Sequence, residues 1–380
     1  MQNHRNKIGS SSTLPKDFFG SSKISLPLGI SFSLPSTLKF VSPIDSYPKV
    51  GQTIIDPNTY DTYLLKMEIG SSCRNGLCRV YKALYTKRME KNGIFVTLKI
   101  LNKNLREFFE LQLEVNASIR FTPYSKLIGL MRTFTTKEYL CVSFPYMSQG
   151  PLRHILSARP EKKLPEDFIA IVLKEVLVGL RDELHVDSNN PKVHKTLNAG
   201  DIFIHIDHAT KERLIKLAFE ASVYDPFYNV GETSSSSSTF LDVKSISKWG
   251  AAPEVYVGEN ATPKSDIWLL GITALELAYG DDLRVRSRED LEYIIEKIRF
   301  KKRLPRSLEK LLIIKKKGKI KKVVLNTFKR NKRVFSKDFE KMVLACLCEN
   351  PEERPTAHQL SSTPFFTTDF DRFEQFLLNG

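Results

Sequence analysis

The chain has 380 residues, of which 41% are hydrophobic and 27% are charged, and its formal net charge is +15 at pH 7. This length suits two to three ordinary domains or one large two-lobed domain, and the composition is that of a globular rather than a disordered protein. No run of 18 apolar residues occurs, so we expect no transmembrane helix. The five scattered cysteines lack a metal-ligand spacing, which indicates a reducing compartment and a cytoplasmic protein.

The first part of the chain, residues 1–58, is rich in serine, proline and glycine and has no sustained hydrophobic periodicity. This composition predicts a flexible tail. The tail lacks the charged start, apolar centre and small-residue cleavage site of a secretory signal peptide. Because it is basic and rich in serine, an organelle transit peptide stays open as an alternative.

Short segments rich in β-branched and aromatic residues follow, from about Tyr60 to Tyr146. Such segments between turn residues predict five strands in a meander. A stretch with helical periodicity, residues 105–118, interrupts them. The predicted strands contain the sequences YLLKMEIG, CRVYKALY, GIFVTLKIL, IGLMRTFT and YLCVSFPY.

From Leu152 onward the apolar residues recur with helical spacing. The clearest predicted helices cover residues 167–185, 265–280 and 337–349. The sequence therefore predicts an α+β fold over residues 61–366, in which a small antiparallel sheet lobe (residues 61–146) precedes a larger helical lobe (residues 147–366). A cleft between two such lobes is the default position for a ligand site.

Three segments fall outside this pattern, and each has two interpretations. Residues 225–248 show little periodicity and include five consecutive serines at 234–238, so they are either a phosphorylated loop or a merely flexible one. The basic run from Lys301 to Arg333 suits a solvated surface loop or, alternatively, a contact with nucleic acid, anionic lipid or an acidic partner. The aromatic C-terminal tail, residues 367–380, either packs on its own lobe or docks into a partner's groove.

Two charged residues in the sheet region have the spacing of a phosphate-binding pair. Lys99 lies in the predicted strand VTLKI, and Glu114 follows in the predicted helix. The arrangement resembles the V-A-I-K strand of protein kinases, whose lysine pairs with a helix glutamate and contacts the phosphates of ATP.

The helical half carries more specific motifs. Glu254 ends an A-P-E motif, Asp266 begins the sequence DIWLLG, which resembles a D-x-W-x-x-G helix, and Glu276 and Arg354 follow at matching distances. Residues 61–366 thus resemble the protein kinase superfamily. Within it they are most similar to the germinal-centre (sterile-twenty-type) serine/threonine branch, which includes the plant blue-light-signalling and the oxidative-stress-responsive kinases. The resemblance implies a buried ion pair between Glu254 and Arg354 that supports the fold.

The resemblance also implies a site for ATP. Lys99 and Glu114 would hold its phosphates, while Val80, Leu98 and Phe144 would line the adenine pocket. Phe144 takes the gatekeeper position and Tyr146 follows in the hinge.

The glycine-rich loop of this site departs from the family pattern. It would begin at Gly70 and end at Val80, yet the segment between them is longer than the motif allows and lacks its later glycines. Those glycines let the backbone approach a phosphate without a clashing Cβ atom. Arg74 or Arg79 either contacts phosphate or is ordinary surface charge.

The catalytic loop departs from the family pattern more severely. The family pattern H-R-D-x-K-x-x-N is replaced by the sequence that starts at His194, HKTLNAGD. Thr196 stands at the catalytic aspartate, and its hydroxyl cannot accept a proton near neutral pH, a role worth about 10²- to 10⁴-fold in rate. Asn198 replaces the lysine that neutralises the transferring phosphate. Asp201 replaces the metal-binding asparagine, and its carboxylate can still hold a cation.

The metal-binding D-F-G motif is also altered. The sequence IKLA, which matches the strand before it, continues with Phe219, Glu220 and Ala221. Phe219 therefore stands at the aspartate position. Glu220 is one position away and supplies a carboxylate only if the backbone shifts, so we expect magnesium to be held poorly.

These substitutions predict a pseudokinase that acts as a scaffold or allosteric regulator of a protein partner, such as an active kinase or its adaptor. Because Lys99 and Glu114 persist, binding of ATP without transfer stays open. One alternative is a weakly active serine/threonine kinase that uses Asp201 and Glu220. The other is a module that binds nucleic acid or anionic lipid through the basic residues 301–333.

Overall fold

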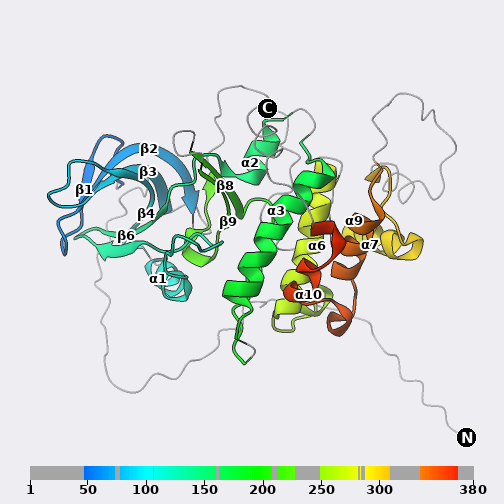
Figure 1. Ribbon diagram of the computed structural model, residues 1–380. Coiled ribbons are helices and arrows are strands. Elements are labelled where there is room, and N and C mark those ends of the chain that lie inside the picture. The colour runs from blue at the N-terminus through cyan, green and yellow to red at the C-terminus, as the bar shows by residue number, and fades with distance from the viewer. Residues whose placement is uncertain are drawn as a thin grey trace, which may run out of the picture. The chain divides into compact units, whose positions relative to one another are not determined.

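A computed structural model describes residues 47–72, 78–105, 107–159, 162–187, 189–207, 212–226, 249–280, 283, 287–308 and 334–366 (Figure 1). Several predicted features lie outside these residues. They are the first 46 residues of the tail, Arg74, the serine run, most of the basic run and the C-terminal tail.

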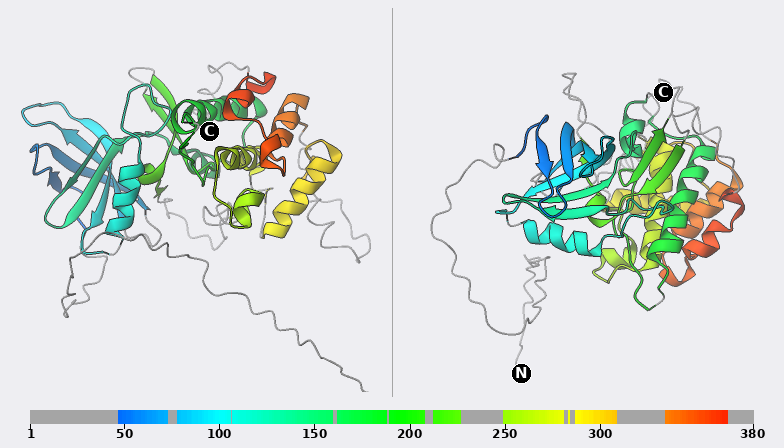
Figure 2. Two further views of the ribbon diagram at one scale, coloured as in Figure 1. Left: turned by 90° about the horizontal axis from the view of Figure 1, so that it is seen from below. Right: turned by 60° about the vertical axis from the view of Figure 1, so that its left-hand side comes forward.

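The first part of the described chain is a curled antiparallel sheet in the order β1-β2-β3-β4-β6-β5. Its strands are β1 (Thr53–Ile55), β2 (Thr62–Ser72), β3 (Cys78–Thr86), β4 (Ile94–Asn102), β5 (Arg132–Thr135) and β6 (Tyr139–Pro145). Helix α1 (Phe108–Ala117) covers one face, where Leu111 and Val115 join Val80 and Val142 in one apolar cluster (Figure 2). The five expected strands and the intervening helix are therefore present, with β1 as an additional strand.

Ordered structure begins earlier than the sequence suggested, because residues 47–58 were expected to belong to the flexible tail. Strand β1 pairs with β2 in this region. The hydroxyl of Tyr81 donates a hydrogen bond to the carbonyl of Pro48 at 2.9 Å. Tyr47 also packs on the sheet, with its ring centroid 6.2 Å from that of Tyr139.

The second part of the described chain is helical and carries a small sheet, β7 (Gly150–Pro151), β8 (Ile202–Asp207) and β9 (Glu212–Leu217). Its short helices are α2 (Leu152–Ser157), α5 (Pro253–Tyr256) and α10 (Ala357–Ser361). Its longer helices are α3 (Glu166–Gly179), α6 (Pro263–Tyr279), α7 (Arg288–Lys301) and α9 (Lys337–Cys346). A π-helical turn, Leu180–Leu184, extends α3, and α3 packs along α6 (Figure 1).

Helix α6 is the central element of the helical part. Thr262 and Ser265 form a capping box at its start, and Pro263 occupies the first turn, where no backbone donor is needed. Every residue from Ser265 to Tyr279 is buried, so the helix is surrounded by protein on all sides, and Asp266 and Glu276 are its buried charged residues. The helix ends before Gly280, whose φ of 52° favours glycine.

No helix within the described ranges is long and apolar enough to cross a membrane.

Candidate functional site

The loop that precedes β8 is held in place by carboxylates from α6. Asp266, which has no exposed side-chain surface, accepts the backbone N–H groups of His194 and Lys195 at 2.8 and 2.9 Å. The same carboxylate lies 2.9 Å from Nε2 of His185. A buried carboxylate with several donors is well satisfied, so the start of this loop has a defined backbone conformation.

The end of the loop is held by a second carboxylate of α6. Glu276 accepts the backbone N–H of Ala199 at 3.0 Å. It also forms a buried ion pair with Arg153, whose Nε and Nη2 atoms lie 2.8 and 2.7 Å from Oε1. The backbone N–H of Arg153 donates to the carbonyl of Ala199 at 3.1 Å, so α2, α6 and the loop are tied together.

The side chains at the expected catalytic positions are Thr196, Asn198 and Asp201. Thr196 is exposed, and the only proton acceptor that its side chain offers is a neutral hydroxyl. The buried amide of Asn198 donates to the carbonyl of Thr196 at 2.7 Å and to Oδ2 of Asp201 at 2.6 Å, and it accepts the N–H of Gly200 at 2.7 Å. Asn198 therefore shapes the loop and does not supply the positive charge of the family's lysine.

Asp201, the expected cation ligand, is only 2% exposed. Burial raises the pKa of its carboxyl to about 6, although the neighbouring His194 and Arg153 oppose this shift. No cluster of three histidine, cysteine, aspartate or glutamate side chains that could hold a metal occurs in the part of the chain that the structure describes. Because magnesium is usually held by one or two carboxylates together with phosphate oxygens and waters, cation binding by Asp201 stays a prediction.

Phe219 packs into the core of the helical part, 4% exposed, with its ring centroid 5.8 Å from that of His194. In the D-F-G motif the phenylalanine is the packing residue and the aspartate is the metal ligand. The geometry therefore favours a register in which Phe219 is that phenylalanine and Ala218 stands at the aspartate, one position from the register expected from sequence. The carbonyl of Ala218 is 2.8 Å from Nε2 of His194, and either register leaves the metal-ligand position without a carboxylate.

Glu220, the alternative carboxylate, is half-buried beside this position and has a φ of 50°. A positive φ is rare for a residue with a Cβ atom. Glu220 is the first residue of the short 3₁₀ turn Glu220–Ser222. The turn is fixed by Ser222, whose hydroxyl oxygen accepts the N–H of Phe219 at 2.8 Å.

Three of the residues expected to bind a nucleotide lie in one row across the sheet, because Gly70 pairs with Val80 and Val80 with Lys99. The row continues from Lys99 to Val142. Val80 and Phe144 share one apolar cluster, as expected. Leu98 does not, because alternate residues of a strand face opposite sides of the sheet and Leu98 belongs to the cluster on the other face. The expected place of Leu98 in the adenine pocket is therefore wrong.

The remaining expected residues lie around this row. Tyr146 is half-buried directly after β6, and Glu114 is half-buried on α1. The pairing of Glu114 with Lys99 stays a prediction. Arg79 neighbours Val80 in the strand and so faces the other side of the sheet, where it forms an ion pair with Glu68 at 3.0 Å. This position makes it an ordinary surface charge.

A segment that sequence reasoning missed lies against the row of nucleotide residues. The ammonium group of Lys99 donates to the carbonyl of Val223 at 2.8 Å. Tyr224 is buried in the cluster of Val80 and Phe144, and its ring centroid lies 5.2 Å from that of Phe203. Strand β10 (Asp225–Pro226) then pairs with the end of β2.

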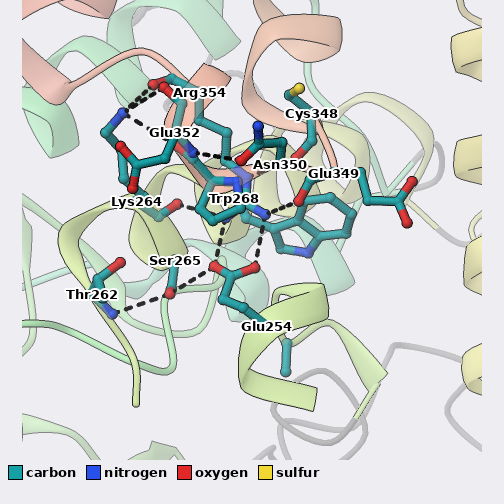
Figure 3. Close-up of polar contacts among 12 residues, drawn as sticks. Glu254, Thr262, Lys264, Ser265, Trp268, Cys348, Glu349, Asn350, Glu352 and Arg354 are labelled. Atoms are coloured by element: carbon teal, nitrogen blue, oxygen red, sulfur yellow. Dashed lines mark hydrogen bonds and ion pairs between the residues drawn. The ribbon is translucent and has the colours of Figure 1, made fainter. Parts of the chain in front are cut away.

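Glu254 and Arg354 form a buried, bidentate ion pair, with 2.6 Å from Nη1 to Oε1 and 2.8 Å from Nη2 to Oε2 (Figure 3). Ser265 donates to the same carboxylate at 2.9 Å, and Arg354 lies over the ring of Trp268. Burial alone would raise the pKa of Glu254, but the hydrogen bonds and charge of Arg354 outweigh it and lower the pKa. The pair joins α5 to the turn before α10.

A family model for the protein kinase domain matches residues 77–366. The chain belongs to the protein kinase family. This kinase domain is similar to the serine/threonine-protein kinase dst1 of Dictyostelium discoideum, with 24% identity over 84% of this chain and 36% of that protein. It is also similar to the serine/threonine-protein kinases fray2 of the same organism (29% identity, 63% of this chain, 21% of that protein) and cst-1 of Caenorhabditis elegans (29%, 60% and 37%).

The chain therefore spans between 21% and 37% of the length of these three relatives. Within the kinase domain the framework contacts are intact, namely Asp266 with the loop backbone and Glu254 with Arg354. The positions that carry chemistry in the family hold Thr196, Asn198 and an apolar residue instead of the metal-binding aspartate.

Proposed function

We propose that this protein is a catalytically inactive serine/threonine kinase homologue, of the sterile-twenty-type branch, that acts as a scaffold or allosteric regulator of a protein partner. One observation carries the proposal: the catalytic loop is held at both ends by Asp266 and Glu276, yet it presents Thr196 where a base is required. Because hydrogen bonds hold both ends of the loop, we expect no small rearrangement to bring another base to this position.

Two further observations support the proposal. Asn198 directs its amide into the loop, so no cation stands beside a transferring phosphate. The metal-ligand position is apolar in both registers of Phe219, and magnesium normally neutralises the charge that develops during transfer. The cytoplasmic location expected for such a regulator agrees with Cys78, Cys141, Cys346 and Cys348, which are all free thiols.

Phosphoryl transfer from radiolabelled ATP to a mixed protein substrate tests the inactive state, with magnesium and with manganese. We expect incorporation no higher than that of a heat-denatured sample of the same preparation. Incorporation that disappears in Lys99→Ala or in Asp201→Ala would show a weakly active kinase and overturn the proposal. Incorporation that persists in both variants would come from a contaminating kinase. This background is subtracted from the wild-type value, and we expect no incorporation to remain.

The regulatory half is tested with the partner in place. A kinase that copurifies with the chain is assayed with and without an equimolar amount of it. We expect kcat/KM of that kinase to change at least about threefold on addition of the folded chain, and to stay unchanged on addition of Arg354→Ala, in which the framework is weakened. An unchanged kcat/KM for every copurifying kinase and for its substrates would contradict the regulatory role.

A further inference from the structure

We propose that residues 223–226 of the chain itself occupy the nucleotide cleft and must leave before ATP can bind. The segment would replace three contacts of a bound nucleotide. These are the phosphate oxygen beside Lys99, the adenine ring in the apolar cluster, and the phosphate contact made by the backbone of the glycine-rich loop. The inference stands apart from the proposed function, because an active kinase could be closed in the same way.

The first part concerns Lys99, the only described cation in the row of nucleotide residues. Its side chain is 1% exposed, and its ammonium group donates to the carbonyl oxygen of Val223 at 2.8 Å. In the family this lysine contacts the phosphates of ATP. A phosphate oxygen at that position and the Val223 carbonyl would occupy the same space beside the ammonium group.

The second part concerns the adenine pocket. Tyr224 is 8% exposed and belongs to the apolar cluster that contains Val80, Phe144, Met147 and Phe203. Its ring lies 5.2 Å from that of Phe203 at an interplanar angle of 48°, which is an ordinary aromatic packing geometry. An adenine ring needs flat apolar space in this cluster, and in the proposal the phenol ring of Tyr224 takes that space.

The third part concerns the edge of the sheet. Strand β10 pairs with β2 in antiparallel register, with Asp225 opposite Ser71 and Pro226 opposite Gly70. Backbone groups at the start of the glycine-rich loop normally turn toward phosphate. In this chain a strand of its own lies along them, in the way that an added strand extends a sheet edge.

The segment is anchored from the residues before it. The hydroxyl of Ser222 donates to the carbonyl of Phe219 at 3.0 Å. The backbone N–H of Ala221 donates to the hydroxyl of Ser118, which follows α1, at 3.2 Å. The segment therefore starts directly after a turn that these hydrogen bonds fix. The same turn carries Phe219 and contacts Ser118, so the position of the segment depends on the packing of Phe219 and α1.

Closure and nucleotide binding exclude each other, so the apparent dissociation constant of ATP is the intrinsic value divided by the open fraction. The test uses the full chain and a fluorescent N-methylanthraniloyl derivative of ATP, with Tyr224→Ala to remove the ring from the adenine pocket. We expect this variant to bind the probe at least about tenfold more tightly than the wild type. Tyr124→Ala is the matched control, because Tyr124 is 94% exposed and should leave the affinity unchanged.

Adding Lys99→Ala to Tyr224→Ala should abolish the gain, which shows that the probe binds in the cleft. Equal, Lys99-dependent affinity of wild type and Tyr224→Ala would overturn the proposal. If Tyr224→Ala does not fold, hydrogen exchange of the wild type decides: the amides of residues 223–225 should exchange slowly, and millimolar ATP should accelerate them. Fast exchange without ATP, or ATP binding that leaves slow exchange unchanged, would also overturn it.

The outcomes separate this inference from the proposed function. Tighter binding without phosphoryl transfer supports both. Tighter binding with transfer supports the closed cleft and contradicts the inactive state. Unchanged binding without transfer contradicts the closed cleft and leaves the inactive state standing.

Discussion

The carboxylate of Asp266, on α6, accepts the backbone N–H of His194 at 2.8 Å, although the two residues are 72 positions apart in the chain. This contact holds the start of the loop that precedes β8 in one backbone conformation. Asp266→Asn replaces one acceptor oxygen by a donor, so a buried backbone N–H loses its partner. We expect a loss of about 1–3 kcal/mol in the free energy of unfolding, measured by urea denaturation.

The same variant should increase hydrogen exchange at His194 and Lys195, whose amides contact the two oxygens of Asp266. Asp187→Asn serves as the control because Asp187 is exposed. Unchanged exchange at both amides in Asp266→Asn would show that the loop is held by other contacts.

The buried pair of Glu254 and Arg354 is expected to dominate the stability of the region around α5. Arg354→Ala leaves an uncompensated buried carboxylate and should lower the free energy of unfolding by about 3–5 kcal/mol. The double substitution Glu254→Met with Arg354→Met should cost less than Arg354→Ala, since no charge is then left unpaired. Thermal unfolding of the three proteins at pH 7 measures this order.

An exposed pair provides the comparison for that experiment. Lys87 and Glu90 lie 3.3 Å apart with more than half of each side chain exposed, so Lys87→Ala should change stability by less than about 1 kcal/mol. The lowered pKa of Glu254 adds a pH dependence. The stability that the pair contributes is present above the ordinary glutamate pKa and is lost as pH falls through the lower folded value. A cost of Arg354→Ala no larger than that of Lys87→Ala would contradict the prediction.

Asp201 gives the opposite pH dependence. Its folded pKa of about 6 exceeds the ordinary value of 3.8, so the unfolded chain releases this proton first as pH rises. The contribution of Asp201 to stability therefore falls between about pH 4 and pH 6 and is unfavourable above that range. Asp201→Asn should raise the free energy of unfolding by about 1–3 kcal/mol at pH 7.5 and by little at pH 4.

Urea denaturation at a series of pH values compares Asp201→Asn with wild type, and Asp338→Asn is the control because half of its side chain is exposed. Parallel pH profiles for wild type and Asp201→Asn would mean that the carboxyl is ionised normally in the folded protein. Such a result would support Asp201 as a cation ligand.

The packed position of Phe219 also makes a prediction. Phe219→Ala empties a buried site beside His194 and should cost about 3–5 kcal/mol of unfolding free energy. Phe300→Ala should change stability by less than about 0.5 kcal/mol, because Phe300 is 82% exposed. If Phe219 instead pointed into the cleft like the aspartate of the family motif, its removal would cost no more than that of Phe300.

The elements and the family of this protein were predictable from the sequence because they depend on local pattern. The helix expected at residues 265–280 is α6, Pro263–Tyr279, since its apolar residues and its terminal glycine lie next to one another in the chain. The place of Lys99 in a strand of the sheet followed from its β-branched neighbours in the same way.

Other features depended on contacts that local pattern does not contain. The side of β4 on which Leu98 lies follows from which face α1 covers, and the register of Phe219 follows from its packing on His194. Residues 47–58 look like a tail in composition, yet their backbone finds partners on β2 and Tyr81.

Sequence by itself determined that this is a kinase domain, and it predicts that the base, the phosphate lysine and the metal aspartate are replaced, because those identities are read at motif positions. Only the tertiary structure decided what fills the cleft. Lys99 and Val223 are 124 positions apart, and no periodicity or motif relates them. Their contact satisfies an ammonium group that is excluded from water, and a buried donor of this kind needs an acceptor.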